Sequence, residues 1–420
     1  MSDWKICKLG EIADVKLSNV DKKTNSDEIS VRLCNYTDVY KNDFINAHKA
    51  ETFMVASCND NEFEKFILRK GQVAITKDSE KRDDIGISTY ISEDFEDVVL
   101  GYHLSLITPN ENHLDGRFLH YWFNTQLAKT YFENNAGGSG QRCTLPIDII
   151  KSIPVHFPEI EIQKRISSIL SKLEKKIEIN NRINDNLEAL AKTIYDYWFV
   201  QFDFPDENGK PYKSSGGKMV YNEVLKREIP DGWEVKCLFE IAEFINGLAC
   251  QKYRPLNEDD DFLPVIKIRE MNEGKSGSTE KVRVNIPKKN IIDDGDVLFA
   301  WSASLDVKIW TEGKGALNQH IFKVVSAAFP RTFYYFEILN YLQHFKMMAE
   351  LRKTTMGHIT IDHLKTSYIT VPPKKLILEL DKVIDKLLEK IITSKKQNQQ
   401  LTQVRDWLLP MLMNGQVSVK

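Results

Sequence analysis

Apolar side chains recur with helical spacing in the stretch from Phe157 to Trp198. The first four fall at intervals of four, three and four residues, which is the a/d seam of a coiled coil. These seam positions are Ile166, Leu170, Leu173 and Ile177. Asn180 and Asn184 then interrupt the seam with polar side chains. Within this stretch, Gln163 to Trp198 would form a helix of about 54 Å at ~1.5 Å per residue, and an apolar seam of that length needs a partner.

A second stretch with the same pattern follows 214 residues later, in the same heptad phase. Its seam positions are Leu380, Ile384, Leu387 and Ile391. Asn398 follows Asn184 by the same offset. Two such helices in one chain favour an antiparallel pair related by a pseudo-two-fold axis, with the buried asparagines fixing its register. The alternative is that each helix covers only its own domain, which explains the apolar stripe but not the length.

The sequence before each helix also repeats. WKICKLGEIADV from Trp4 resembles WEVKCLFEIAEF from Trp233, and ILRKGQVAITKDS resembles IIDDGDVLFAWSAS. His103 matches His320, and TLPIDIIKSIPVHFP matches HITIDHLKTSYITVP. The pattern predicts an α+β protein with two mixed domains in tandem, each followed by a long helix. The expected divisions are a first domain at 1–156, a helix at 157–200, a linker at 201–228, a second domain at 229–372, and a second helix with its tail at 373–420.

Composition narrows the class of protein. The chain has 420 residues, 42% of them hydrophobic and 28% charged, which is typical of a soluble, cytoplasmic protein of several domains. It contains no apolar run of the ~18 residues that a membrane span requires. The six scattered cysteines fit free thiols in a reducing compartment and predict no zinc site. The formal net charge is −3, whereas many nucleic-acid binders are strongly basic. Any binding of nucleic acid would therefore need local basic surfaces.

Signatures of catalysis are missing from the sequence. There is no phosphate-binding P-loop, no dinucleotide-binding glycine motif, no H-E-x-x-H, no G-x-S-x-G and no N-P-P-Y-type tetrapeptide. His103 and His320 lie in apolar, strand-like runs, which favours core histidines over metal ligands. The sequence therefore favours a binding or scaffold protein over an enzyme.

Several segments carry a family resemblance. QKRISSILSKLEKKIEINNRIN is followed by LEALAKTIYDYWFVQFDFP, the second unit opens with IPDGWEV, and the last helix ends in WLLPMLMNGQV. With this order of parts, essentially the whole chain resembles the DNA-specificity subunit of type I restriction–modification systems.

The resemblance implies a non-catalytic subunit with two target-recognition domains, each reading one half of a bipartite site in double-stranded DNA. The helices would set the spacer between the half-sites and dock two methyltransferase subunits, and restriction–translocase subunits would join in turn. No cofactor is expected in this chain, whereas S-adenosylmethionine, ATP and Mg²⁺ are expected on the partner subunits. Trp198 has no aromatic counterpart at Leu412, so the two docking sites are expected to differ in affinity.

Polar loops at matching points of the two repeats are the predicted DNA contacts, because cations position phosphates and polar side chains read base edges. In the first domain they are Lys77, Ser79, Lys81, Arg82, Ser139, Gly140, Gln141 and Arg142. In the second they are Trp301, Ser302, Ser304, Arg352, Lys353, Thr354, Thr355 and His358. Arg142 and Arg352 are the foremost candidates, and ordinary surface residues are the alternative. We expect the isolated chain to bind DNA weakly and with steep salt dependence.

Aromatic residues near the helix ends are candidates for partner docking. They are Tyr197, Trp198, Phe199 and Trp407. The simpler interpretation is that they form core at the junction of helix and domain. An alternative function for the whole chain is a coiled-coil scaffold with two peptide-binding domains and no nucleic acid. An enzyme with an unrecognised site is a third, less favoured alternative.

Overall fold

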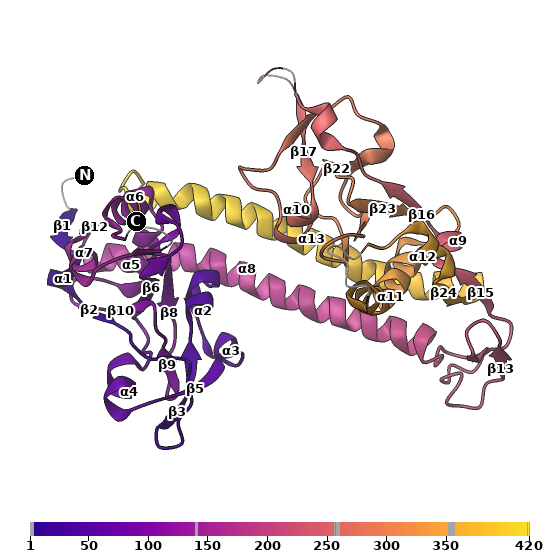
Figure 1. Cartoon of the computed structure of the whole chain (residues 1–420), viewed down its shortest axis with the longest axis horizontal. Helices are drawn as coiled ribbons and strands as arrows, with labels where there is room; N and C mark the ends of the chain where they lie inside the picture. The colour runs from indigo at the N-terminus through magenta and orange to yellow at the C-terminus, as the bar shows by residue number, and fades with distance from the viewer. Residues whose placement is uncertain are drawn as a thin grey trace. The chain divides into compact units, whose positions relative to one another are not determined.

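The computed structural model describes residues 4–138, 142–255, 257, 261–351, 358–417 and 419. The chain forms two compact units (Figure 1). The first consists of Met1–Lys176 and Leu401–Lys420, and the second of Ile177–Gln400. Helix α8 (Ile160–Tyr195) therefore begins in the first unit and ends in the second, whereas α13 (Lys374–Met413) does the reverse.

The first unit is centred on a five-stranded sheet with the order β2-β10-β6-β8-β4. Its strands are β2 (Ala13–Leu17), β10 (Leu104–Pro109), β6 (Val73–Thr76), β8 (Ser88–Ile91) and β4 (Phe44–Ile45). Every side chain of β6 and β8 is buried. Helix α5 (Gly116–Phe123) supplies Phe118 and Trp122 to the core beside this sheet. Because β6 and β8 are buried on both faces, these two strands form the centre of the unit's core.

A three-stranded sheet with the order β5-β3-β9 forms a second layer of the first unit. Its strands are β5 (Met54–Cys58), β3 (Ile29–Cys34) and β9 (Val98–Leu100). The remaining short strands pair as β1 (Lys5–Lys8) with β12 (Pro154–Phe157), and β7 (Asp78–Ser79) with β11 (Cys143–Thr144). The remaining helices before α8 are α1 (Leu9–Ile12), α2 (Tyr36–Lys41), α3 (Ala47–Ala50), α4 (Asp60–Phe66), η1 (Arg82–Asp84), α6 (Gln126–Asn135) and α7 (Ile147–Ser152).

The second unit contains two four-stranded sheets, β16-β23-β20-β21 and β18-β17-β22-β19. The first comprises β16 (Glu243–Asn246), β23 (Ile321–Val325), β20 (Val297–Ala300) and β21 (Asp306–Ile309). The second comprises β18 (Lys281–Arg283), β17 (Phe262–Ile266), β22 (Gly315–Leu317) and β19 (Ile291–Ile292). Two further pairs are β15 (Glu234–Cys237) with β24 (Tyr368–Val371), and β13 (Met219–Asn222) with β14 (Arg227–Pro230). The helices are α9 (Leu238–Ile241), η3 (Cys250–Tyr253), α10 (Ile268–Glu273), η4 (Lys288–Asn290), α11 (Arg331–Leu351) and α12 (Ile361–Thr366).

The two units share their main pairings, which confirms the tandem arrangement. The antiparallel pair β1–β12 matches β15–β24, and the parallel pair β3–β9 matches β17–β22. Gly71 and Gly295 have φ angles of 92° and 90° at the turns before β6 and β20, a conformation that glycine adopts without steric cost. Backbone bonds repeat as well, since Leu9 N donates to Ile153 O as Leu238 N does to Ser367 O.

Hydrogen bonds at its N-terminal end attach α8 to the first unit. Gln163 is fully buried, and its amide accepts from the backbone of Asp115 and donates to the carbonyls of His113 and Pro158. Ser167 adds a bond of 2.8 Å to the carboxylate of Asp115. Because a buried amide is costly to leave unpaired, these bonds fix the direction in which the helix leaves the domain.

Within the second unit, α8 and α13 run antiparallel, as the sequence predicts. The Asn180 amide donates to Asn398 Oδ1 over 2.8 Å, and Asn398 donates to Asn181 over 2.7 Å. Lys395 of α13 pairs with Glu188 of α8 at 2.9 Å. The asparagines therefore form a polar layer inside an otherwise apolar seam, which defines one register of the pair.

The end of α8 is packed into the second unit rather than projecting from it. The helix continues as a π-helical turn, η2 (Asp196–Val200). Phe199 and Phe202 meet the Trp233 ring edge-on, with ring centroids 5.7 and 5.3 Å away, and Phe204 stacks on the same indole. This cluster joins helix and linker to the domain core.

Candidate nucleic-acid interface

The loop after β6 and two distant segments meet at one edge of the first unit. Lys77 N donates to His103 O, and Leu145 N donates to Lys77 O. Asp78 pairs with Thr144 in the short β7–β11 ladder. The backbone thus fixes three chain segments at this edge without depending on their side chains, a common way to present variable contact residues.

Asp78 is the electrostatic centre of this edge. Its Oδ2 lies 2.6 Å from Lys77 Nζ and 2.6 Å from His103 Nδ1. Burial raises the pKa of the Asp78 carboxyl, but hydrogen bonds from Lys77, Thr144 and His103 outweigh burial, so that the pKa is lowered overall. Asp78 therefore stays ionised at neutral pH and holds the lysine and the histidine in place.

A pocket of about 380 Å³ opens beside Asp78. It is lined by Tyr36, Tyr40, Asp78, Ser79, Glu80, Lys81, Asp84, His103 and Arg142. The Tyr36 and Tyr40 rings stack with centroids 5.8 Å apart, and the Tyr40 hydroxyl donates to Asp84 over 3.0 Å. Stacked aromatic rings beside paired cations and carboxylates offer both planar surfaces and hydrogen-bonding groups to a ligand.

The second unit repeats the same framework with other side chains. The backbone N–H of Trp301 donates to His320 O, and that of Ile359 donates to Trp301 O. Ser302 and His358 form an isolated antiparallel β-bridge. The Trp301 ring lies 5.7 Å from His320 and 5.8 Å from His358, and its Nε1 donates to Asn246 over 3.3 Å. An aromatic cluster thus occupies the position where the first unit has its ion-paired aspartate.

Some predicted contact residues gather at these two places. Ser79, Lys81 and Arg142 line the first pocket, Lys77 lies beside it, and Arg82 is exposed in η1. Trp301 and His358 form part of the second cluster, Ser304 is exposed, and Ser302 is only 3% exposed. Ser139, Gly140, Gln141, Arg352, Lys353, Thr354 and Thr355 lie outside the described residues. The roles of all these residues stay predictions.

The interpretation of His103 and His320 as core histidines needs correction. Both stand in turns, and His103 has a φ of 71° with its side chain 35% exposed. The apolar strand that follows each histidine produced the error. Tyr36, Tyr40 and Asp84 were also missed, because only the fold brings α2 and η1 beside the loop.

The candidate docking residues differ in exposure. Phe199 is 2% exposed inside the core, which corrects its assignment to a partner surface. Trp198 is half-buried against the same core. Tyr197 and Trp407 are 38% and 63% exposed, so they remain candidates for a partner.

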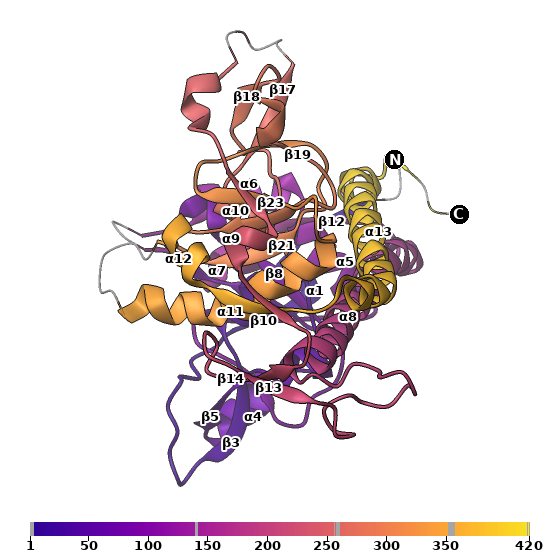
Figure 2. The same cartoon turned by 90° about the vertical axis from the view of Figure 1, so that its right-hand side faces the viewer.

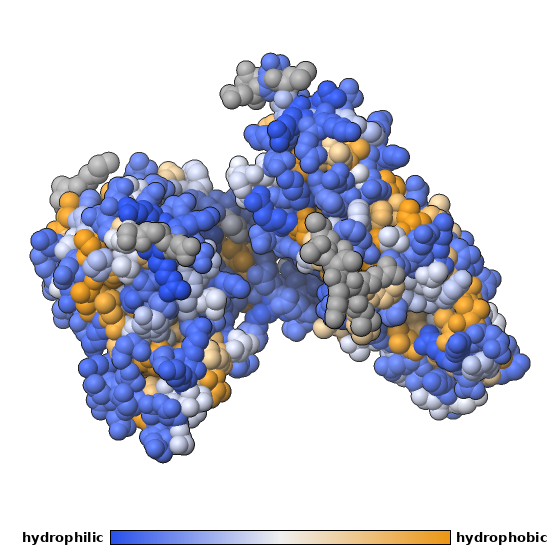
Figure 3. Space-filling view, viewed as in Figure 1, coloured by the Kyte–Doolittle hydropathy of each residue, from blue (hydrophilic) through white to orange (hydrophobic). Residues whose placement is uncertain are grey.

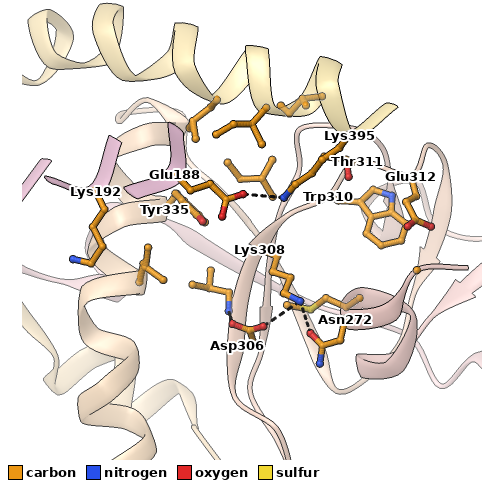
Figure 4. Close-up of a pocket in the computed structure, with 18 of the residues that line it drawn as sticks. Glu188, Lys192, Asn272, Asp306, Lys308, Trp310, Thr311, Glu312, Tyr335 and Lys395 are labelled. Carbon is orange, nitrogen blue, oxygen red and sulfur yellow. Dashed lines mark hydrogen bonds and ion pairs between the residues drawn. The ribbon is translucent and has the colours of Figure 1, made fainter. Parts of the chain in front are cut away.

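A larger cavity of about 670 Å³ in the second unit lies between the helix pair, β21 and α10. Figure 4 shows Glu188 and Lys395 reaching toward each other from α8 and α13, and Lys308 reaching toward Asn272. Lys308 also pairs with Asp306. Because these polar groups satisfy one another instead of converging on the empty centre, we interpret the cavity as a packing gap.

In the part of the chain that the structure describes, no group of three or more metal-ligating side chains comes together. Nor does any helix in that part have the length and apolar character needed to cross a membrane.

Residues 1–189 and 230–403 match the family described as the type I restriction modification DNA specificity domain. The chain belongs to this family. The two matched segments correspond to the two repeats, each with much of its long helix.

Similar proteins agree with this assignment. The specificity subunit of the type I restriction enzyme MjaIX from Methanocaldococcus jannaschii is 26% identical, over 72% of this chain and 69% of its own length. That of HindI from Haemophilus influenzae is 24% identical, over 99% of this chain and 100% of its own length. The crystal structure of the S subunit of a type I restriction–modification system from M. genitalium has a TM-score of 0.58 at 14% identity, covering 98% of this chain and 96% of its own. At that identity, the structural likeness concerns the fold.

Proposed function

We propose that this chain is the DNA-specificity subunit of a type I restriction–modification enzyme, and that each unit reads one half of a bipartite target in double-stranded DNA. The observation that carries the proposal is the repeated framework with exchanged side chains. Asp78, Thr144 and His103 in one unit take the places of Ser302, His358 and His320 in the other. One backbone with two sets of side chains is what two readers of different sequences require.

The chemistry of the two sets suits different bases. Arg142 and Lys81 in the first pocket supply cationic donors, and Asp84 supplies an acceptor. Arginine suits the two acceptors of guanine, and carboxylates suit the amino group of cytosine. Trp301 and His358 offer apolar edges and ring nitrogens instead. The two half-sites are therefore expected to differ in sequence.

The long helices are proposed to carry the partner subunits. Exposed apolar side chains recur along α8 at spacings of four and seven residues, which places them on one face. They are Ile179, Ile183 and Leu190, between 40% and 47% exposed, and Tyr197, 38% exposed, follows in the π-helical turn η2. Methyltransferase subunits docked on this face and near Trp407 would supply S-adenosylmethionine chemistry. Restriction subunits would supply the ATP- and Mg²⁺-dependent steps, and this chain would be non-catalytic.

Domain exchange tests the proposal. The chain is co-produced with its methyltransferase subunit, and methylated adenines are mapped genome-wide before and after residues 1–156 are replaced by those of a relative. We expect a gapped motif in which one half changes and the other stays. A motif that is unaffected by the exchange would contradict the two-reader function.

Docking is tested separately with Ile183→Asp and Trp407→Asp, each compared with Asp185→Asn, a change at an exposed position on another face of α8. The expected result is loss of co-purifying methyltransferase in the first two variants only. Retention of full stoichiometry in both would contradict the assignment of this helix face.

A further inference from the structure

A two-stranded ribbon, formed by β17 and β18, extends from the second unit in both views (Figures 1 and 2). Phe262 lies opposite Arg283, Leu263 opposite Val282, and Pro264 opposite Lys281. Because side chains alternate across a strand, the middle pair faces one side and the outer pairs face the other. Leu263 and Val282 pack into a small apolar core, which leaves the opposite face of the ribbon outward.

The outward face combines cations with aromatic rings. Lys281 Nζ lies 3.9 Å from the centroid of the Phe262 ring, and the Arg283 guanidinium lies 5.4 Å from that of Tyr253. Lys281 is exposed and Phe262 is 45% exposed. Rings that hold cations by cation–π attraction restrict their motion without neutralising their charge.

No carboxylate of the described residues pairs with either cation within 4.0 Å, although neighbouring cations are paired. Lys267 binds Glu280, and Arg269 binds Glu270. The surface of this lobe is largely hydrophilic in Figure 3. Lys281 is therefore exposed and without a carboxylate partner, whereas Arg283 is half-buried, and its Nε is buried without a hydrogen-bond partner among the described residues. Both charges are available to an anionic partner, Lys281 the more fully.

The ribbon is connected to the candidate interface of the second unit by one sheet. β17 runs parallel to β22, and Asn318 N at the end of β22 donates to Ile266 O at the end of β17. His320 follows two residues later in the interface turn. Phe262 stands four residues before Ile266, about 13 Å along a strand at ~3.3 Å per residue. That distance corresponds to roughly four base-pair steps of duplex at ~3.4 Å each.

We propose that the outward face of the β17–β18 ribbon, through Lys281 and Arg283, binds the phosphate backbone of DNA flanking the half-site read by the second unit. The inference rests on the proposed function and adds a contact that carries affinity without sequence information. The ammonium of lysine is a point charge suited to phosphate, and Phe262 positions it.

Protection of a sheet edge is the competing explanation for these cations. β18 is an edge strand, and lysines on edge strands prevent unwanted strand pairing. Edge protection predicts that loss of the two charges causes self-association and leaves DNA binding unchanged. Phosphate binding predicts the opposite pattern, so that one set of variants separates the two.

The test uses the full chain assembled with its methyltransferase subunits, and measures the Kd for target and non-target duplexes from low to moderate salt. For Lys281→Ala/Arg283→Ala we expect the slope of log Kd against log salt to fall by about 2, since each phosphate contact contributes ~0.9. Affinity for both duplexes should fall roughly tenfold at low salt. The methylated motif should stay the same.

Two control variants define the outcome. Lys281→Arg/Arg283→Lys keeps the charges and should keep the slope. Lys210→Ala/Lys213→Ala removes the same charge from two exposed linker positions of the second unit and should also keep it.

An unchanged slope in the ribbon variant overturns the inference, and so does an equal loss in the linker variant. Loss of a co-purifying subunit at unchanged DNA affinity overturns it in favour of a protein partner. If the unmodified complex neither binds nor methylates DNA, the proposed function itself fails, which is a distinct result.

Discussion

The two units hold the same three chain segments together with the same backbone bonds, yet their exposed chemistry differs. In the first unit an ionised Asp78 binds Lys77 and His103. In the second, Trp301 lies among histidines. Backbone hydrogen bonds do not depend on which side chains the segments carry. The two units therefore share one backbone geometry at the interface and differ in the side chains that are available for recognition.

The same comparison extends to how each unit holds α8. In the first unit Tyr121 of α5 donates to Glu174 of α8 over 2.6 Å. In the second the roles are exchanged, since Tyr195 of α8 donates to Glu337 of α11 over 2.6 Å. Burial raises the pKa of each carboxyl to about 7. The two attachments are therefore expected to respond alike to pH.

The largest predicted effect tests whether the two attachments of α8 respond alike to pH. Both carboxyls have a higher pKa in the folded chain than the ~4.3 of an unfolded glutamate. Their stabilisation is thus fully present below about pH 4.3 and is lost as pH rises through about 7, a change of about 3 kcal/mol per site. Glu174→Gln and Glu337→Gln should each remove part of the decline in melting temperature between pH 5 and pH 8. A decline that persists in the double variant would contradict the assignment.

A smaller effect is predicted where the two interfaces differ most. Asp78→Ser gives the first framework the residue of the second, and releases Lys77 and His103. We expect specific binding to weaken by about 2 kcal/mol, roughly 30-fold, because contacts to bases typically contribute 1–3 kcal/mol each. The measurement is the methylation rate on duplexes altered in either half-site, and only one half should be affected. Asp83→Ser, at an exposed neighbour outside the pocket, is the control. Equal effects of the two changes would contradict a role for Asp78 at the interface.

The next prediction, of about 1 kcal/mol in the free energy of unfolding, compares one buried asparagine in each long helix. Asn398 is bonded to Asn180 and Asn181, whereas its counterpart Asn184 is 2% exposed and its amide has no partner among the described residues. An unpaired buried amide is costly and a paired one is not. In urea denaturation of the full chain, Asn184→Leu should therefore raise the free energy of unfolding and Asn398→Leu should lower it, each by about 1 kcal/mol. The same sign for both changes would refute the distinction.

Sequence predicted the repeats and the helices because both are periodic. Ile166, Leu170 and Ile384 are buried as the seam pattern requires. Further along the second helix the pattern drifts, since Leu388 is buried and Leu387 is only partly so. A straight helix turns away from a strict heptad repeat, and α13 also packs on a domain. Periodicity thus located the helices but not every buried position.

The interface was harder to predict, because it depends on turns and on distant segments. The polar loop after β6 was visible, since polarity changes abruptly after a buried strand. The left-handed turn at His103 and the approach of Tyr40 were not, because no local pattern encodes them. The ribbon was missed for a related reason. Lys281 and Arg283 look like ordinary surface charges until strand pairing places them beside Phe262.

The smallest predicted effect compares the β17–β18 ribbon with its counterpart in the first unit, the antiparallel pair β3–β5, here called the first ribbon. In the first unit Arg32 of β3 corresponds to the exposed face of the second ribbon, but Asp97 pairs with it through two bonds of 2.6 and 2.7 Å. The Arg32 guanidinium holds the pKa of the Asp97 carboxyl below its usual range, so the pair is ionised at neutral pH. Asp97→Asn frees one cation at a cost of less than about 1 kcal/mol in stability, because exposed ion pairs contribute little.

If the first ribbon also runs beside DNA, Asp97→Asn should steepen the salt dependence of binding by about 1, the amount expected for one added phosphate contact. Arg32→Ala/Asp97→Asn is the matched control, since it removes the pair without releasing a charge. An unchanged slope in Asp97→Asn, together with a reduced slope in Lys281→Ala/Arg283→Ala, would make the phosphate contact a property of the second unit alone. In that case the two units would differ in how tightly they hold DNA as well as in the bases they read.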